Sequence, residues 1–238
     1  MILLEKRVSI IIPVFNEEER IARTIKGLID AGIKCLGEII IVDDGSTDKT
    51  RDEINSLGLG SIIYIRLNRN YGKGAALRKG LEISRYPIIA FLDGDLGDTS
   101  KEIIKLIEPV YKNKADVSIA VFPTPSTKGG FGILKKVSRL GVWVLTNRYM
   151  ENPICGQRVF KKSVFSNIEI PDRFGVEIGM TIDILNQGFK VWEVPVQMSH
   201  RETKRDLQGC VHRGKELIDV LRVLMRKFYK HKNAVNRG

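Results

Sequence analysis

Four apolar runs near the start of the chain, each followed by a polar loop, constrain the fold most. They lie at residues 8–15, 38–42, 62–66 and 88–92, and helical spacing of apolar residues fills the intervals between them. Nearly continuous β-branched residues are typical of parallel strands covered on both faces. Strands that alternate with helices predict an α/β fold, with a mostly parallel sheet flanked by helices and ligands bound beyond the carboxyl ends of the strands.

The fourth run ends in Asp93-Gly94-Asp95, two carboxylates separated by one glycine. At the carboxyl end of a strand both acids can face one hard cation, and Gly94 lets the backbone approach it closely. The motif therefore predicts a place for a diphosphate bound to Mg²⁺ or Mn²⁺. The alternative is an Asp-Gly turn that simply follows a buried strand.

Length, charge and cysteine content restrict the class of protein. With 238 residues and a formal charge of +11, the chain fits a single domain whose partners are anionic: sugar nucleotides, phosphorylated acceptors, acidic membrane surface or nucleic acid. Cys35, Cys155 and Cys210 predict neither disulfides nor a zinc site and favour a reducing, cytoplasmic setting. Since no apolar run is long enough to cross a bilayer, any membrane contact is expected to be peripheral, at the inner face.

Four motifs occur in order along the first half of the chain: VSIIIPVFNEE at 8–18, IVDDGSTD at 41–48, NYGKGA at 70–75 and DGD at 93–95. Together they resemble family 2 glycosyltransferases with the GT-A fold, and within that family the soluble dolichyl-phosphate sugar synthases. A later stretch, FGVEIG at 174–179, is similar to a motif of glucosyl-3-phosphoglycerate synthases. The resemblance implies a GT-A domain at 1–200, divided into a nucleotide-sugar half (1–112) and an acceptor half (113–200), before a basic helical tail (201–238).

The same resemblance implies roles for the donor-side residues. One of Asp43 and Asp44 is expected to contact the nucleotide base, commonly uracil, and Lys73 to reach the phosphates. Asp95 is expected to be the first metal ligand and to take part in catalysis, and Asp93 to act through the ribose or a metal-bound water. The residues predicted to bind the nucleotide sugar are Pro13, Phe15, Glu17, Asp43, Asp44, Lys73, Asp93, Gly94 and Asp95.

Purely local roles are the alternative for several of these residues. The turn 43–48 is rich in side chains that cap helices, and Lys73 can be a solvated loop lysine. Asp98 extends the acidic loop but is assigned to structure. Two pairs have the spacing of capping boxes for the helices that follow: Asn16 with Glu19, and Thr99 with Glu102.

The acceptor half begins with a predicted strand at 115–121 and a loop at 122–130 that could close over bound substrate. An amphipathic helix at 131–150 is expected to cover the sheet, in preference to a lipid-contacting helix. Gln157 and Arg158 either line the acceptor site or are ordinary polar residues at a strand edge.

Glu177 precedes an apolar helix at 178–186. Its carboxylate could act as general base on an acceptor hydroxyl or bind the acceptor, or it is a first-turn acid that suits the helix dipole. Gly188 is predicted to end that helix, and 191–196 to form an edge strand. By resemblance to a histidine of glucosyl-3-phosphoglycerate synthases, the metal ligands are Asp95, Asp93 and His200, with His212 as the fallback.

The tail from residue 201 onward is strongly basic, with eleven Lys and Arg against four Asp and Glu. Its apolar residues predict a helix within 209–229. That helix is either docked on the domain with a solvated basic face, which is the expected arrangement, or an anchor on anionic lipid. Ahead of it, Arg201, Lys204 and Arg205 could reach over the diphosphate.

These features predict a metal-dependent glycosyltransferase that uses a nucleotide-diphosphate sugar, most simply a UDP-sugar. Family 2 resemblance implies inversion by direct displacement, whereas the glucosyl-3-phosphoglycerate synthase resemblance implies retention. The acceptor stays open between polyprenyl phosphate, a small phosphorylated acid and a cell-surface saccharide, and a homodimer is compatible with the sequence. A sugar nucleotidyltransferase would carry a Gly- and Arg-rich loop where this chain has residues 13–18. A remote alternative, a non-catalytic binder of anions or nucleic acid, would also explain the charge. Nucleic acid is not an expected partner, because the sequence has no recognition motif and no aromatic stacking platform.

Overall fold

A seven-stranded sheet forms the centre of the computed structural model, which describes residues 7–58, 60, 62–122, 131–168, 170–171, 175–199 and 217–229. The strand order is β3-β2-β1-β4-β6-β5-β7. All described pairs are parallel except those of β6, which runs antiparallel to both β4 and β5. The strands are β1 (Val8–Val14), β2 (Leu36–Asp43), β3 (Ile62–Arg66), β4 (Ile88–Phe91), β5 (Val117–Val121), β6 (Arg158–Lys161) and β7 (Val191–Pro195). The predicted α/β class and mostly parallel sheet are confirmed.

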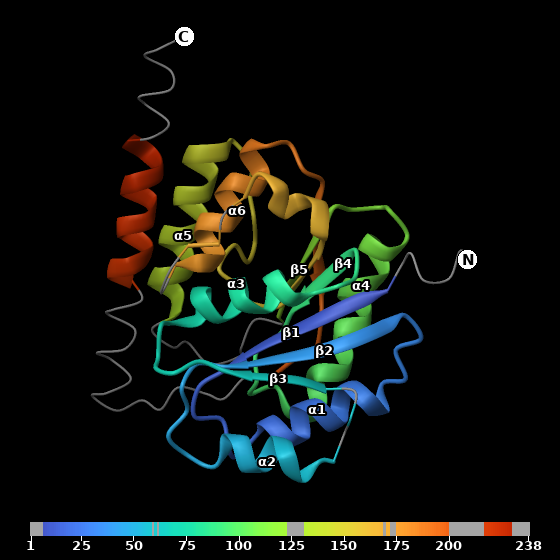
Figure 1. The fold of residues 1–238 in the computed structure, drawn as a ribbon. Helices are drawn as coiled ribbons and strands as arrows, with labels where there is room; N and C mark the ends of the chain where they lie inside the picture. The colour runs from blue at the N-terminus through green and yellow to red at the C-terminus, as the bar shows by residue number, and fades with distance from the viewer. Residues whose placement is uncertain are drawn as a thin grey trace.

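Helices cover both faces of this sheet (Figure 1). Helices α1 and α2 lie on one side, and α3, α5 and α6 on the other, with α5 packed on α6. Helix α4 packs across β5 and β6, and a further helix at 217–229 lies beside α5. The bounds are α1 (Ile21–Asp30), α2 (Thr50–Ser56), α3 (Lys73–Ile83), α4 (Ile103–Tyr111), α5 (Phe131–Thr146) and α6 (Val176–Asn186), with 3-10 turns η1 (Gly97–Glu102) and η2 (Lys162–Ser166).

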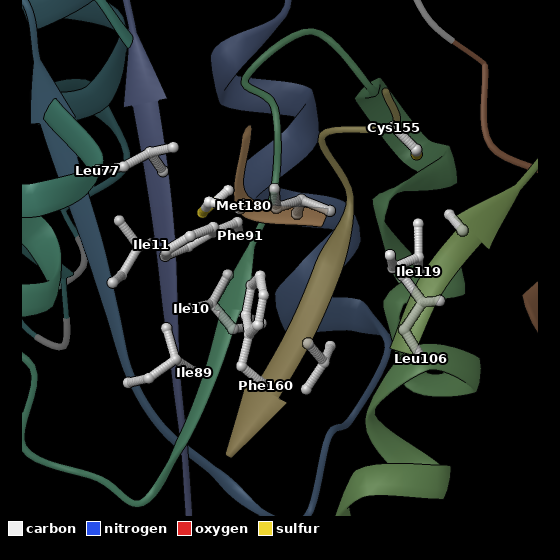
Figure 2. Close-up of a cluster of buried hydrophobic side chains, with 14 of the residues drawn as sticks. Ile10, Ile11, Leu77, Ile89, Phe91, Leu106, Ile119, Cys155, Phe160 and Met180 are labelled. Atoms are coloured by element: carbon white, nitrogen blue, oxygen red, sulfur yellow. The ribbon is translucent and has the colours of Figure 1, made fainter. Parts of the chain in front are cut away.

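One hydrophobic core joins the first and second halves of the chain (Figure 2). The rings of Phe91 on β4 and Phe160 on β6 have centroids 5.0 Å apart, and both are buried with Ile11, Leu77 and Met180 from β1, α3 and α6. Since side chains from both halves share this core, the chain forms a single domain. The core fixes β4 and α6 relative to each other; Asp93 lies in the loop that follows β4, and Glu177 lies in the first turn of α6.

Both predicted capping boxes are wrong. Helix α1 begins at Ile21 with no side-chain cap, and Asn16 adopts a left-handed conformation with φ of 57°. The segment around Thr99 forms η1, and Glu102 instead accepts bonds from Lys105 and from the backbone N–H of Gln197. Capping signals are local, whereas these polar side chains bond to segments distant in sequence.

The helix at 217–229 is docked on the domain, as the sequence favoured. A Cβ added at Gly141 of α5 would come within 2.5 Å of Leu224, and one at Gly175 within 2.9 Å of Val223. Lys227 forms an ion pair with Asp183 of α6. Among the helices of the described ranges, none combines the length and apolarity that a bilayer crossing requires.

Candidate active site

The topology brings the polar loops of both halves to one edge of the sheet. Strands β1, β2 and β4 are parallel, so the loops that follow Val14, Asp43 and Phe91 leave the same edge. Strand β6 is antiparallel, so its first residue, Arg158, lies opposite Phe91, the last residue of β4. Because of this reversal, the segment before β6 meets the Asp93-Gly94-Asp95 loop.

Two of these loops, 16–18 and 46–50, are joined by hydrogen bonds in both directions. Backbone N–H groups of the first loop donate to side chains of the second, and backbone N–H groups of the second donate to Asn16 and Glu18. The bonds are Asn16 N to Ser46 Oγ (3.0 Å), Glu17 N to Thr50 Oγ1 (2.8 Å), Glu18 N to Asp48 Oδ2 (3.2 Å), Thr47 N to Asn16 Oδ1 (2.8 Å) and Lys49 N to Glu18 Oε2 (2.8 Å). The residues that resembled helix caps therefore fix the shape of this edge of the sheet.

Asp43 and Asp44 are both buried and hold backbone in place. Asp43 accepts bonds from Ser46 N (2.7 Å) and from the Tyr64 hydroxyl (2.6 Å). Burial and the Asp43 carboxylate together raise the pKa of Tyr64. Asp44 accepts from the N–H groups of Tyr71 (2.8 Å) and Gly72 (2.7 Å). Asp44 thereby fixes the turn that starts α3 and presents Lys73.

Lys73 joins the two halves of the site. Its Nζ lies 2.7 Å from Asp93 Oδ1 and 2.8 Å from Glu177 Oε1. Gln157 Nε2 donates to the other Asp93 oxygen at 2.6 Å. Burial disfavours the ammonium form, but the two carboxylates outweigh it and raise the pKa of Lys73. We call Lys73, Asp93, Gln157 and Glu177 the Lys73 cluster; it carries two negative charges and one positive charge.

Gly156 leaves the space in which the Lys73 cluster assembles. A Cβ at this position would lie 2.7 Å from Lys73 Nζ and 3.0 Å from Asp93 Oδ2. A larger residue would therefore displace the ion pair. Sequence reasoning missed Gly156 because nothing local distinguishes it from other loop glycines.

Arg158 lies behind the site, not in it. The side chain is fully buried, and it donates from Nε to the Cys155 carbonyl (2.6 Å) and from Nη2 to the Pro153 carbonyl (2.8 Å). Cys155 in turn donates from Sγ to Gln157 Oε1 (3.1 Å), and burial raises its pKa to about 12, which keeps the thiol protonated. These bonds orient the Gln157 amide so that its NH₂ group faces Asp93.

A model of glycosyl transferase family 2 matches residues 9–174, more than half of the chain and the whole of this edge up to the start of α6. The chain belongs to glycosyl transferase family 2. It is similar over 231 residues to a dodecaprenyl-phosphate galacturonate synthase of Rhizobium johnstonii, with 24% identity covering 93% of this chain and 68% of that protein. It is also similar, over 107 residues, to an undecaprenyl-phosphate 4-deoxy-4-formamido-L-arabinose transferase of Pseudomonas paraeruginosa, with 36% identity covering 42% of this chain and 31% of the relative.

Solved structures share the fold of this glycosyltransferase. Glucosyl-3-phosphoglycerate synthase from Mycobacterium tuberculosis, crystallised with Mn²⁺, UDP and phosphoglyceric acid, superposes with a TM-score of 0.77. The identity is 21%, and the match covers 93% of this chain and 78% of that one. A second crystal structure of the same enzyme, in complex with Mg²⁺ and UDP, superposes with a TM-score of 0.79. These likenesses establish the GT-A fold.

In this glycosyltransferase, the backbone of Gly94 and Asp95 is bound by side chains at the start of α1 and just before it. Thr24 Oγ1 donates to the Gly94 carbonyl (2.7 Å), and Arg20 Nη1 donates to the Asp95 carbonyl (3.0 Å). Asp98 points elsewhere and pairs with Arg23 at the surface. Two further residues predicted to bind the donor are Pro13 and Phe15. Pro13 lies within β1, and Phe15 comes directly after the end of β1 and is 43% exposed.

Only some of the predicted metal ligands lie among the described residues. Among them, no group of three or more His, Cys, Asp or Glu side chains is placed to hold a metal ion. Of the two carboxylates in the Asp93-Gly94-Asp95 motif, Asp93 is bound by Lys73 and Gln157. The remaining predicted residues, His200, Arg201, Lys204, Arg205 and His212, and the loop 123–130, lie outside the described residues.

Proposed function

We propose that this glycosyltransferase transfers a sugar from a UDP-sugar to polyprenyl phosphate. The observation that carries the proposal is the Lys73 bridge: one ammonium group contacts Asp93 at the end of β4 and Glu177 in the first turn of α6. A donor motif and an acceptor-side carboxylate therefore share one cation. The names of the relatives, which specify dodecaprenyl and undecaprenyl phosphates, support the acceptor class.

The reaction forms a bond between an acceptor phosphate oxygen and C1 of the sugar, and it breaks the bond from C1 to the nucleoside diphosphate. The leaving diphosphate takes the electron pair, so negative charge increases on its oxygens. A Mg²⁺ or Mn²⁺ ion held by Asp95, with Asp93 close by, would neutralise that charge. Lys73 would add a second positive charge from the protein.

Glu177 has a role that depends on the acceptor. A phosphate acceptor is ionised at neutral pH, so no proton has to be removed from it and Glu177 would position Lys73. A hydroxyl acceptor would need a base, and Glu177 is the acidic side chain of the cluster on the acceptor side. Gln157 and Arg158 would act by positioning, Gln157 through Asp93 and Arg158 through the backbone of residues 153–155.

A small phosphorylated acid is the second candidate acceptor. It is supported by the TM-score of 0.77 to an enzyme crystallised with phosphoglyceric acid. The two candidates differ in chemistry as well as in location. Polyprenyl phosphate would accept the sugar on an ionised phosphate oxygen at a membrane surface, whereas a phosphorylated hydroxy acid would accept it on a hydroxyl in solution, with Glu177 as the base.

Calorimetric titration tests the donor assignment. UDP-glucose, GDP-mannose and the free nucleotides are titrated with Mn²⁺ present and again after chelation. We expect metal-dependent binding of the uridine compounds, lost in Asp95→Asn and retained in Asp98→Asn, since Asp98 pairs with Arg23 at the surface. Failure of a folded sample to bind any of these nucleotides, or equal binding by Asp95→Asn, would contradict the proposal.

A further inference from the structure

Two neighbouring helices expose an unusual amount of apolar side chain. Monomeric proteins rarely leave large contiguous apolar patches in water, and such patches mark interaction sites. On α5 and the helix at 217–229, nine large apolar side chains are between 41% and 66% exposed. They are Ile133, Leu140, Trp143 and Val144 on α5, with Ile218, Leu221, Met225, Phe228 and Tyr229 on the other helix. We call these nine residues the two-helix face.

The exposed residues form one surface. The four on α5 and the five on the other helix each form a stripe along their helix, and both stripes lie next to the contact between the helices. The helices lie side by side (Figure 1), with Leu224 against Gly141. Leu221 and Phe228 are three residues before and four after Leu224, and Val144 is three after Gly141, so they are surface neighbours of that contact. The stripes are also distinct from the sides that pack inward, where Ser138, Val142, Leu145 and Val220 are buried.

Charge around the two-helix face selects its partner. Helix α5 contains Lys135, Lys136 and Arg139 and no acidic residue. On the other helix, Arg222 and Arg226 are exposed, and the single acid, Asp219, is paired with Arg222. An apolar stripe bordered by Lys and Arg fits the surface of an anionic bilayer, where apolar side chains enter the interface and basic ones meet the headgroups. A second copy of this chain would bring two basic borders together, which is repulsive.

The two-helix face is connected to the Lys73 cluster through α6. Val223 packs against Gly175 and Gly179, which lie on either side of Glu177. Helix α6, which carries Glu177, is therefore packed against both helices of the two-helix face. Docking of that pair on a bilayer would hold the cluster at a fixed position relative to the membrane surface.

We propose that the two-helix face docks this enzyme on anionic lipid bilayers and so presents the Lys73 cluster to an acceptor phosphate in the membrane. This inference rests on the proposed function for the identity of the acceptor, whereas the docking itself requires no sugar nucleotide. The partner is the bilayer surface, recognised by its apolar interior edge and its negative headgroups.

Co-sedimentation of the full chain with vesicles tests the proposal. The vesicles are phosphatidylcholine alone, or phosphatidylcholine mixed with phosphatidylglycerol. We expect binding to the mixed vesicles, weakened by salt, and at least about tenfold weaker binding by Leu140→Gln/Met225→Gln. The matched control is Ile104→Gln, which replaces an exposed apolar residue of α4 and should bind like wild type. A second double variant, Lys136→Gln/Arg226→Gln, removes border charges without touching the apolar stripe and should reduce binding to the mixed vesicles only.

Several outcomes would overturn the inference. These are no sedimentation of the wild type, equal loss in Ile104→Gln, or a change from dimer to monomer in Leu140→Gln/Met225→Gln with vesicle binding unchanged. Transfer to detergent-dispersed polyprenyl phosphate separates this inference from the proposed function. If transfer persists without vesicle binding, only the docking is wrong; if vesicles bind but no nucleotide does, only the proposed function is wrong.

Discussion

Opposite edges of the sheet each carry carboxylates beside a cation, but the two groups differ in burial and in the number of carboxylates for each cation. At the amino edge, Glu38 of β2 accepts bonds from the Ser9 hydroxyl (2.6 Å) and from Arg85 through N (2.8 Å) and Nε (2.8 Å). Its side chain is 1% exposed. At the carboxyl edge, Asp93 and Glu177 share Lys73 and remain 26% and 17% exposed.

The difference separates a structural ion pair from a candidate binding site. Glu38 has one cation of its own, accepts three hydrogen bonds and is buried, so a ligand cannot reach it. Burial disfavours its charged form, but the bonds from Ser9 and Arg85 prevail and lower its pKa. The Lys73 cluster has one cation for two carboxylates and is partly exposed, so its excess negative charge is within reach of a ligand.

Removing Lys73 should have the largest effect. In Lys73→Met the two carboxylates lose their shared cation and the leaving diphosphate loses a positive charge, so turnover should fall at least about 100-fold, roughly 2.7 kcal/mol. The thermal midpoint should shift by no more than about 4 °C, because the cluster is partly solvated. The control is Lys79→Met, six residues along the same helix, whose ammonium pairs with Glu82 at the surface. Equal turnover rates for the two variants would show that Lys73 takes no part in the reaction.

Glu38→Gln should give the opposite pattern. Losing the charge leaves the Arg85 guanidinium without its carboxylate and weakens the bond from Ser9, which costs about 1–3 kcal/mol of unfolding free energy. Donor binding and turnover should stay at the wild-type level, since Glu38 is at the far edge of the sheet. Urea unfolding measures the free energy of unfolding, and steady-state kinetics measure turnover. A Glu38→Gln variant that is stable but inactive would contradict the purely structural role of Glu38.

Gly156→Ala should show how tightly the cluster is packed. The new Cβ would displace Lys73 or Asp93, and we expect turnover to fall about tenfold with a small change in stability. Gly132→Ala is the matched control, because a Cβ there meets nothing within 4 Å. Wild-type rates for Gly156→Ala would show that the ion pair can move without loss of function.

The smallest expected effect is a pH dependence of stability. Since the pKa of Glu38 is lower in the folded state, its ionisation stabilises the fold above the unfolded pKa, and that contribution is lost as pH falls through the folded pKa. The difference in unfolding free energy between wild type and Glu38→Gln should therefore shrink in acid. Unfolding curves over a series of pH values measure it, and a constant difference would contradict a role for the Glu38 charge.

The sequence predicted the strands and helix starts around the candidate site well, because their signals are local. The strand that ends before Asp93, the turn before Lys73 and the position of Glu177 at a helix start all follow from short patterns. The sequence could not show that Lys73 joins Asp93 to Glu177, because three segments distant in sequence must meet. It also placed Arg158 as an open alternative between acceptor and strand edge, whereas its burial depends on how residues 153–157 fold over β6.

Polar residues in loops were the other source of error. Asn16 and Glu102 have ordinary capping positions in sequence, yet their side chains bond to the backbone of Thr47 and Gln197. A local pattern cannot reveal a tertiary partner that competes for the same oxygen atom.

The most direct test of the Lys73 cluster as the transfer site is sugar transfer itself. Labelled sugar is followed from a UDP-sugar to detergent-dispersed polyprenyl phosphate for wild type, Lys73→Met and Glu38→Gln. We expect product from wild type and Glu38→Gln and almost none from Lys73→Met. A parallel assay offers 3-phosphoglycerate as the acceptor. Transfer to 3-phosphoglycerate alone would show that the proposed acceptor is wrong and that the proposed site is right. Equal transfer by Lys73→Met, or loss of transfer in Glu38→Gln at a temperature where it is folded, would contradict the account.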